Sequence, residues 1–268
     1  MSTTKIKRAD KVPRKRIVFI LNHFYKNEAS HFFHVTNLIE RISERNVSVT
    51  LVIEKSDCKP DLKGSNVQVI CQRRSGILRY LELLAILIRL RRQGFTKFFI
   101  RISSPAAVCA ILVARFSGGQ TYFWQSGTTH NNQDPRRKNI IQLLKSELPF
   151  AFVKQFTNKF VTGPESMVDY YRSVVGVKEE KLLCLYNDID LSRFCPANTV
   201  TKSEIKKQLG IPQGAKVMLF VKRMSPIKGI RFYFPHILEQ NIKLLKEGGW
   251  RVYLIGDGGE RAELTYDI

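Results

Sequence analysis

The chain is short of acidic residues. Its 268 residues include 23 Asp and Glu against 44 Lys and Arg, which gives a formal net charge of +21. So large a basic excess favours anionic partners: nucleic acid, an anionic membrane face or phosphorylated substrates. Aromatic residues do not alternate with the basic runs as a stacking platform for nucleic acid requires. We therefore expect no nucleic acid partner, and keep a basic nucleic-acid-binding protein as an alternative.

Paired cysteines are also missing. The five cysteines are an odd number, and none has CxxC or zinc-ligand spacing. Because disulfides are rare in the cytosol, this usage indicates a reduced, cytoplasmic setting. The polar, basic N-terminus has no apolar segment after it, which is unlike a signal peptide.

Long hydrophobic runs are absent as well. A helix is expected over residues 76–93, and its longest uncharged run, Leu83 to Ile88, is far shorter than the ~20 residues of a membrane span. Its apolar arc is wide, with Arg79, Glu82 and Arg89 on one stripe. We expect a buried layer helix over a sheet, and the alternative is a helix in a bilayer interface.

What the chain does contain is a core. Hydrophobic residues make up 44%, and the length suits one large domain or two ordinary ones. Short apolar runs alternate with helical patterns, which is typical of open parallel α/β sheets. We expect strands at 17–21, 47–53, 98–100, 121–124, 160–162, 182–186, 217–221 and 250–255. Helices are expected at 31–45, 76–93, 106–114, 139–159 with a break at Pro149, 164–176, 203–210 and 230–246.

The expected domains follow from composition. Residues 1–16 are strongly basic, and we expect a disordered leader rather than a tail on anionic lipid. A first domain at 17–197 and a second at 198–268 are separated at a polar linker, 197–202.

The most informative stretch is 217–229, VMLFVKRMSPIKG. It predicts a buried strand, a loop with a Ser-Pro turn, and a helix after Gly229. Arg223 and Lys228 stand five residues apart across that turn. A helix N-terminus with two cations suits a phosphorylated ligand. The alternative is an ordinary basic surface loop.

This stretch resembles the R-x-S-P-x-K-G signature of GT-B glycosyltransferases of family 4, the "group 1" glycosyltransferases. Other segments resemble the same family in the same order: 22–35, 124–128, 185–196 and 255–260. The resemblance implies an α/β fold of GT-B type, with two Rossmann-like parallel-sheet domains facing a cleft. The family continues beyond the point where this chain stops, so we expect the second domain to be incomplete.

The resemblance also implies an activity. A sugar would pass from a nucleotide-diphosphate sugar to a hydroxyl acceptor, such as a glycan or lipid-linked glycan, with retention of configuration and without metal or cofactor. The residues that match the family's donor-binding segments are Arg223, Lys228, Gly229, Asn27, Ser30, Asn187, Asp190, Gly256 and Gly258.

The chain departs from the family's sequence pattern at two places, one on the acceptor side and one in the loop that faces the donor. Ala29 and Ser30 stand where the family usually has two glycines, and Ser126 stands where many relatives have a histidine. Ser126 and His130 are therefore the catalytic candidates, with His130 as a substitute for that histidine. Asp188-x-Asp190 matches the metal motif of a different fold only superficially, so no metal site is predicted.

Three alternatives stay open beside this hypothesis. One is a truncated, non-catalytic GT-B protein that binds a sugar nucleotide or a partner. Another is a GT-B sugar-nucleotide epimerase, and the third is the nucleic-acid binder. We expect a cytoplasmic protein, with peripheral contact at the inner face of an anionic membrane as an open addition.

Overall fold

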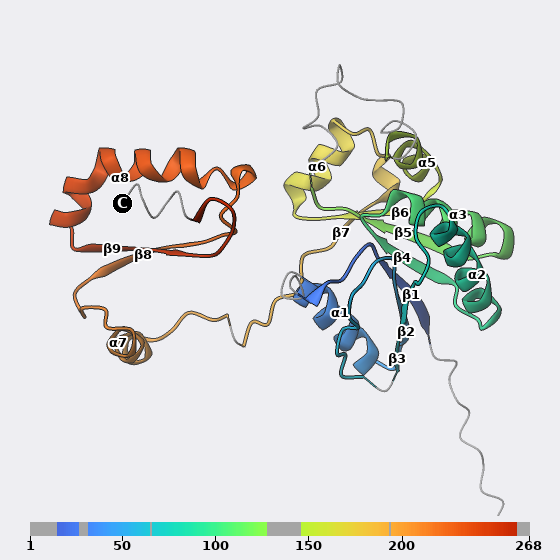
Figure 1. The fold of residues 1–268 in the computed structure, drawn as a ribbon, viewed down its shortest axis with the longest axis horizontal. Coiled ribbons are helices and arrows are strands. Elements are labelled where there is room, and N and C mark those ends of the chain that lie inside the picture. Colours follow the sequence, from blue (N-terminus) through green and yellow to red (C-terminus); the bar gives the residue numbers. More distant parts are fainter. Residues whose placement is uncertain (1–14, 27–31, 65, 128–145, 193, 262–268) are drawn as a thin grey trace, which may run out of the picture. The chain divides into compact units, whose positions relative to one another are not determined.

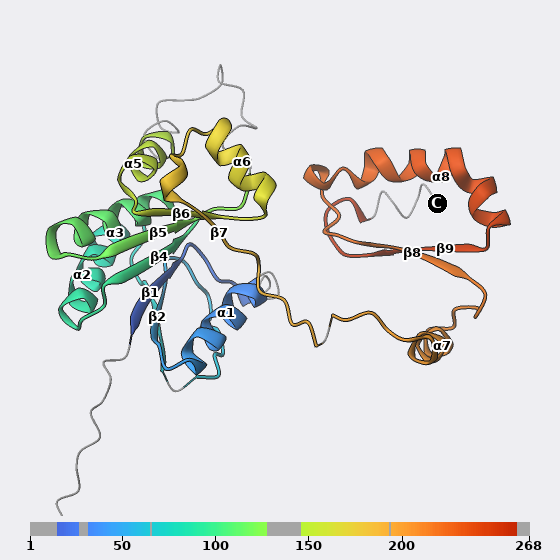
Figure 2. The same cartoon turned by 180° about the vertical axis from the view of Figure 1, so that it is seen from behind.

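The computed structural model divides into two compact units, Met1–Asp190 and Leu191–Ile268, and each is described by itself (Figures 1 and 2). It describes residues 15–26, 32–64, 66–127, 146–192 and 194–261. The leader expected at 1–16 lies outside these residues except for its last two.

The first unit is built on a seven-stranded sheet in the order β3-β2-β1-β4-β5-β6-β7, with every pair parallel. Six of these strands were predicted from apolar runs and are confirmed, although β7 ends two residues before the predicted residue 186. The seventh, β3, was not predicted from the sequence. The strands are β1 (Arg16–Leu21), β2 (Ser48–Ile53), β3 (Val67–Cys71), β4 (Lys97–Arg101), β5 (Gln120–Trp124), β6 (Lys159–Thr162) and β7 (Leu182–Cys184).

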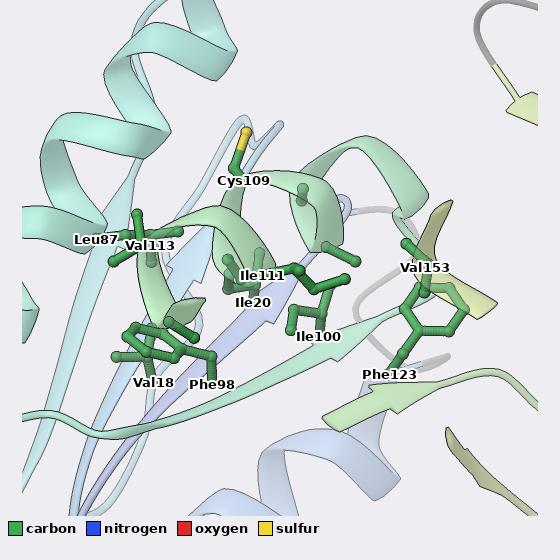
Figure 3. Packing of buried hydrophobic residues seen from close by; sticks show 14 of the residues in the cluster. Val18, Ile20, Leu87, Phe98, Ile100, Cys109, Ile111, Val113, Phe123 and Val153 are labelled. Atoms are coloured by element: carbon green, nitrogen blue, oxygen red, sulfur yellow. The ribbon is translucent and has the colours of Figure 1, made fainter. Parts of the chain in front are cut away.

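Helices cover both faces of this sheet. Along β1, Val18 and Ile20 pack toward α2, α3 and α5, while Phe19 and Leu21 pack toward α1. Figure 3 shows the first of these two cores, where side chains of α3 lie over those of β1 and β4. The uniform apolar runs are thus explained by burial on both sides. The helices are α1 (Phe33–Glu44), α2 (Leu78–Arg92), α3 (Ser104–Ser117), α5 (Leu148–Phe156) and α6 (Glu165–Ser173).

The predicted kink or break at Pro149 stays a prediction, because residues 139–145 of the expected helix lie outside the described part. Residues 146–147 are π-helical and α5 begins at Leu148, so Pro149 occupies the first turn of α5. The first turn is where a missing N–H costs nothing, because that donor has no intrahelical partner.

Helix α2 is a layer helix, as expected, with Leu83, Leu87 and Leu90 fully buried against the sheet side. Its exposed side differs in part from the expected stripe: Arg89 is exposed but Arg79 is largely buried, and Leu78 and Leu81 are 48% and 59% exposed. Among the described residues, none of the helices combines the length and hydrophobicity needed to cross a bilayer.

The second unit contains the parallel pair β8 (Lys216–Val221) and β9 (Trp250–Ile255), joined through α8 (Ile230–Glu247). Both strands and the helix confirm the sequence prediction. A small core surrounds Met224, and Phe220, Leu238, Val252 and Leu254 pack against it.

Helix α7 (Thr199–Gln208) begins inside the segment 197–202 that was expected as linker, and it ends near the predicted position. The reason is a cap: the Asn198 side chain accepts a hydrogen bond from the Thr201 N–H at 2.8 Å. An Asn at this position satisfies one of the free donors of the first turn.

Candidate functional site

Two loops meet at the carboxyl edge of the second unit's sheet. Residues 222–229 follow β8 and residues 256–260 follow β9, and parallel strands end at the same edge. The Met224 N–H donates to the Asp257 carbonyl at 2.9 Å, and the Glu260 N–H donates to the Met224 carbonyl at 3.2 Å. The basic loop and the glycine loop of the sequence analysis therefore form one assembly.

Gly256 and Gly258 make this close approach possible. A Cβ on Gly256 would lie 1.9 Å from the Lys222 carbonyl oxygen, and a Cβ on Gly258 would lie 2.1 Å from that of Met224. By contrast, a Cβ on Gly259 would meet no atom within 4 Å. The structure thus gives both predicted residues a packing role, while their contact with a nucleotide stays a prediction.

Arg223 and Lys228 occupy the loop of residues 222–229, and both are exposed. Lys228 ends a short 3-10 turn, Pro226–Lys228, and the buried Gly229 follows with φ of 65°. That left-handed conformation suits glycine and leads directly into the first turn of α8. The N–H groups of a helix's first turn lack intrahelical partners, and together with nearby cations they can bind phosphate.

Several predicted residues of the first unit lie outside the described part: Asn27, Ser30 and His130. Ser126 is described and exposed, and its hydroxyl accepts a hydrogen bond from the indole N–H of Trp124 at 3.0 Å. The Tyr171 hydroxyl donates to the Gly127 carbonyl at 2.6 Å. These two bonds fix the start of the loop after β5.

The segment after β7 carries the remaining predicted residues. Asn187 is exposed and Asp190 is half-buried. Between them, the Asp188 carboxylate lies 3.4 Å from Nε of Arg41 on α1, and this ion pair ties the segment to the first unit. Within the described part of the chain, no group of His, Cys, Asp or Glu side chains is arranged to hold a metal ion.

Sequence reasoning missed Glu54 and Arg79 in the first unit. Glu54 directly follows β2 and is 4% exposed, and its Oε2 lies 3.9 Å from Nε of Arg79. Burial raises the pKa of the Glu54 carboxyl, and a hydrogen bond with Ser103 and the charge of Arg79 oppose that rise. The available signal was a charged residue immediately after an apolar run, at the strand end where α/β sheets bind ligands.

Comparison with known proteins gives matches of structure alone. No family model matches the sequence, and no curated protein matches it. HepE of Anabaena, solved with UDP and glucose, matches with a TM-score of 0.61 at 15% sequence identity. The match covers 95% of this chain and 65% of the HepE chain. A glycosyltransferase from Rickettsia africae matches with a TM-score of 0.58 at 9% sequence identity, and the match covers 96% of this chain and 72% of the Rickettsia chain.

A third structure is WaaG, a glycosyltransferase of lipopolysaccharide biosynthesis, with a TM-score of 0.52 at 13% identity. The match covers 94% of this chain and 66% of WaaG, so the chain spans about two thirds of the length of these proteins. Identities this low establish fold rather than activity. The parallel sheets, their helices and these matches together establish that the chain has an α/β fold of the GT-B type.

Proposed function

We propose that this chain belongs to a glycosyltransferase that moves a sugar from a nucleotide-diphosphate sugar to a hydroxyl acceptor, with retention of configuration and without a metal ion. The observation that carries the proposal is the assembly of two loops at the ends of β8 and β9. It joins the exposed cations Arg223 and Lys228, the N-terminus of α8 and a glycine loop in one place.

In this proposal, Arg223 and Lys228 bind the diphosphate of the donor. Negative charge grows on the diphosphate as the bond to the sugar breaks, and fixed cations stabilise that charge without reorganising. Gly229 turns the chain so that the first N–H groups of α8 follow Lys228 directly. The crystal structure of HepE with UDP, a protein of the same fold, supports a nucleotide ligand for this chain.

The acceptor side is proposed to lie in the first unit, with Ser126 and His130 as catalytic candidates and Asn27 and Ser30 toward the donor sugar. Ser126 already accepts the Trp124 N–H, so its hydroxyl retains its proton to donate to a sugar oxygen. Asn187 and Asp190 are proposed to contribute from the segment after β7.

A thermal-shift screen against UDP-, GDP-, ADP- and dTDP-sugars tests the proposal. We expect one donor to raise the melting temperature of the wild-type chain and to lose most of that effect with Arg223→Ala, because the diphosphate loses a cation. Lys243→Ala is the matched control, since Lys243 is an exposed lysine of α8 whose side chain is 87% exposed. It should respond like the wild type. Equal stabilisation of Arg223→Ala would contradict the assignment.

Product analysis separates the enzyme from its alternatives. With an acceptor present, a transferase releases nucleoside diphosphate and forms a glycoside. An epimerase converts the donor sugar without an acceptor, and a non-catalytic protein is stabilised by the donor but forms no product.

We also propose that the outer surface of α2 and α3 contacts an anionic membrane face. Leu81 is 59% exposed and Phe116 is 85% exposed, and Arg89, Arg92 and Arg115 are exposed on the same two helices. Apolar side chains beside arginines are typical of interfacial helices, which insert the former and place the latter near anionic lipid.

Sedimentation with vesicles tests this contact. We expect binding to vesicles of phosphatidylcholine with phosphatidylglycerol, and little binding to phosphatidylcholine alone. The pair Leu81→Gln and Phe116→Gln should weaken binding about tenfold or more, because about 1.5 kcal/mol or more of apolar burial is lost. Leu209→Gln, at a leucine of the second unit that is 67% exposed, is the control. Equal binding of the double variant and the control would refute the contact.

A further inference from the structure

A polar pocket of about 300 Å³ opens at the carboxyl edge of the first unit's sheet. Its lining includes the residues that follow four neighbouring strands: Asn22 after β1, Glu54 after β2, Ser103 beyond β4 and Gln125 after β5. The strand order turns from descending to ascending between β1 and β4. Open α/β sheets bind ligands at such a switch point, outside the strand ends.

Glu54 is the unusual member of this lining. Its side chain is only 4% exposed, its Oε2 is 3.9 Å from Nε of Arg79, and the Ser103 hydroxyl donates to the carboxylate. Among the described residues, no donor reaches its Oε1. A buried acceptor without a donor costs about 1–3 kcal/mol, and more when the group is charged. A buried acceptor of this kind takes its donor from a ligand or from an ordered water, and a ligand group can replace such a water.

The rim of the pocket is strained at Ile102, whose φ is +68°. A β-branched side chain rarely adopts this conformation, and residues held in it cost on the order of 1–3 kcal/mol and gather at binding sites. The conformation is held by the Ile102 N–H, which donates to the Trp124 carbonyl at 3.0 Å. It places Ser103 where the hydroxyl serves both Glu54 and the cap of α3.

The lining selects the chemistry of the ligand. Glu54 and Arg79 offset each other's charge and Lys55 is exposed, so the buried part of the lining has no net charge to select an anion. A metal ion would need several acidic ligands, and the lining has one. Glu54 offers an acceptor, Arg79 offers donors, and Tyr80 with Ile102 adds apolar surface. A neutral group with several hydroxyls satisfies acceptor and donors together. The volume lies at the small end of ligand pockets, which suits one sugar-sized group.

We propose that this pocket binds a neutral sugar-like group through a hydroxyl that donates to Oε1 of Glu54, with Arg79 donating to a second oxygen of the same group. The proposal rests on the proposed function in one respect: it identifies the bound group with the hydroxyl acceptor. Glu54 and Arg79 then determine which acceptor enters, in a pocket whose lining extends to Gln125 at the start of the loop of Ser126.

Saturation-transfer NMR of the 268-residue chain tests the pocket, with methyl glucoside, methyl galactoside, methyl mannoside and methyl N-acetylglucosaminide as probes. At least one glycoside should bind the wild type, and Glu54→Gln should weaken its affinity about tenfold or more through loss of a charged acceptor. Glu44→Gln is the matched control, because Glu44 is an exposed acid of α1, and it should bind like the wild type.

A double variant controls for misfolding of Glu54→Gln, which leaves the Arg79 charge without its partner. Glu54→Leu with Arg79→Met removes both charges and puts apolar side chains of similar volume in their place, a replacement that buried pairs often tolerate. It should also lose glycoside binding. Equal affinity in the wild type, Glu54→Gln and the double variant would overturn the proposal, as would the absence of saturation transfer to all four glycosides.

The same samples distinguish this proposal from the proposed function. The nucleotide sugar that stabilises the wild type in the thermal-shift screen is expected to stabilise Glu54→Gln equally, because the proposed diphosphate contacts, Arg223 and Lys228, belong to the second unit. If none of the four nucleotide sugars stabilises either protein while a glycoside binds in a Glu54-dependent way, the donor assignment fails and the pocket stands. If one of them stabilises both proteins and no glycoside binds, the pocket fails alone.

Discussion

Glu54 keeps a carboxylate almost out of water beside Arg79, an arrangement that contributes little to stability on average because desolvation offsets the attraction. The sequence shows Glu54 as an acid directly after an apolar run, but it does not show that the side chain is buried. That burial depends on strands β1, β2 and β4 meeting at one edge. Arg223 and Lys228 were predictable, because a strand, a turn and a helix start lie within one short stretch.

The raised pKa of Glu54 gives stability a pH dependence with a definite sign. The folded pKa lies above the ordinary 4.5, so the folded chain holds this proton at a pH where the unfolded chain has released it. The contribution is therefore most favourable below pH 4.5 and is lost as pH rises through the folded pKa. Glu54→Gln lacks this loss, so its stability relative to the wild type should increase with pH.

The measurement is urea unfolding of both proteins at several pH values between about 4.5 and about 7.5, which spans the ordinary range of carboxyl titration. The chain has two tryptophans, and Trp250→Phe leaves Trp124 as the reporter of the first unit. If the unfolding free energy of Glu54→Gln minus that of the wild type stays constant or falls as pH rises, the desolvated carboxylate is contradicted.

Among the elements, strands buried on both faces were the most predictable. Apolar runs such as 17–21 are short, lack alternation and are bounded by polar residues, a pattern typical of strands buried on both faces. Strand β3 was missed because it lies at the sheet edge, where its residues are only partly buried and its pattern is weak. The change from a π-helical turn at 146–147 to α5 at Leu148 could not be predicted, because it depends on packing rather than on a local pattern.

The contact between the loops after β8 and β9 gives an element-scale prediction. Gly256→Ala should destabilise the second unit by about 2 kcal/mol or more, because the new methyl group would overlap the Lys222 carbonyl 1.9 Å away and force the loops apart. Hydrogen exchange of the β8 and β9 amides reports the change. Gly259→Ala, which meets nothing within 4 Å, is the control and should exchange like the wild type. Matching protection in Gly256→Ala would show that the loops do not approach this closely.

For the whole molecule, the sequence motifs predicted the GT-B type of fold, and the structure confirmed it. The acceptor side was the part that motifs described least, since two departures from the family fall there and Asn27, Ser30 and His130 lie outside the described residues. Two anionic partners are proposed for this strongly basic chain, whose net charge is +21. One is the diphosphate of a donor in the second unit, and the other is anionic lipid at α2 and α3 of the first.

The central claim is that Arg223 and Lys228 hold a pyrophosphate, and calorimetric titration with UDP and with uridine tests it most directly. UDP should bind the wild type and Lys243→Ala with equal affinity. Arg223→Ala with Lys228→Ala should bind UDP at least a hundredfold more weakly, at about 1.5 kcal/mol or more for each charged contact. Any affinity for uridine should be the same in all three proteins. A double variant that binds UDP as tightly as the wild type would contradict the account.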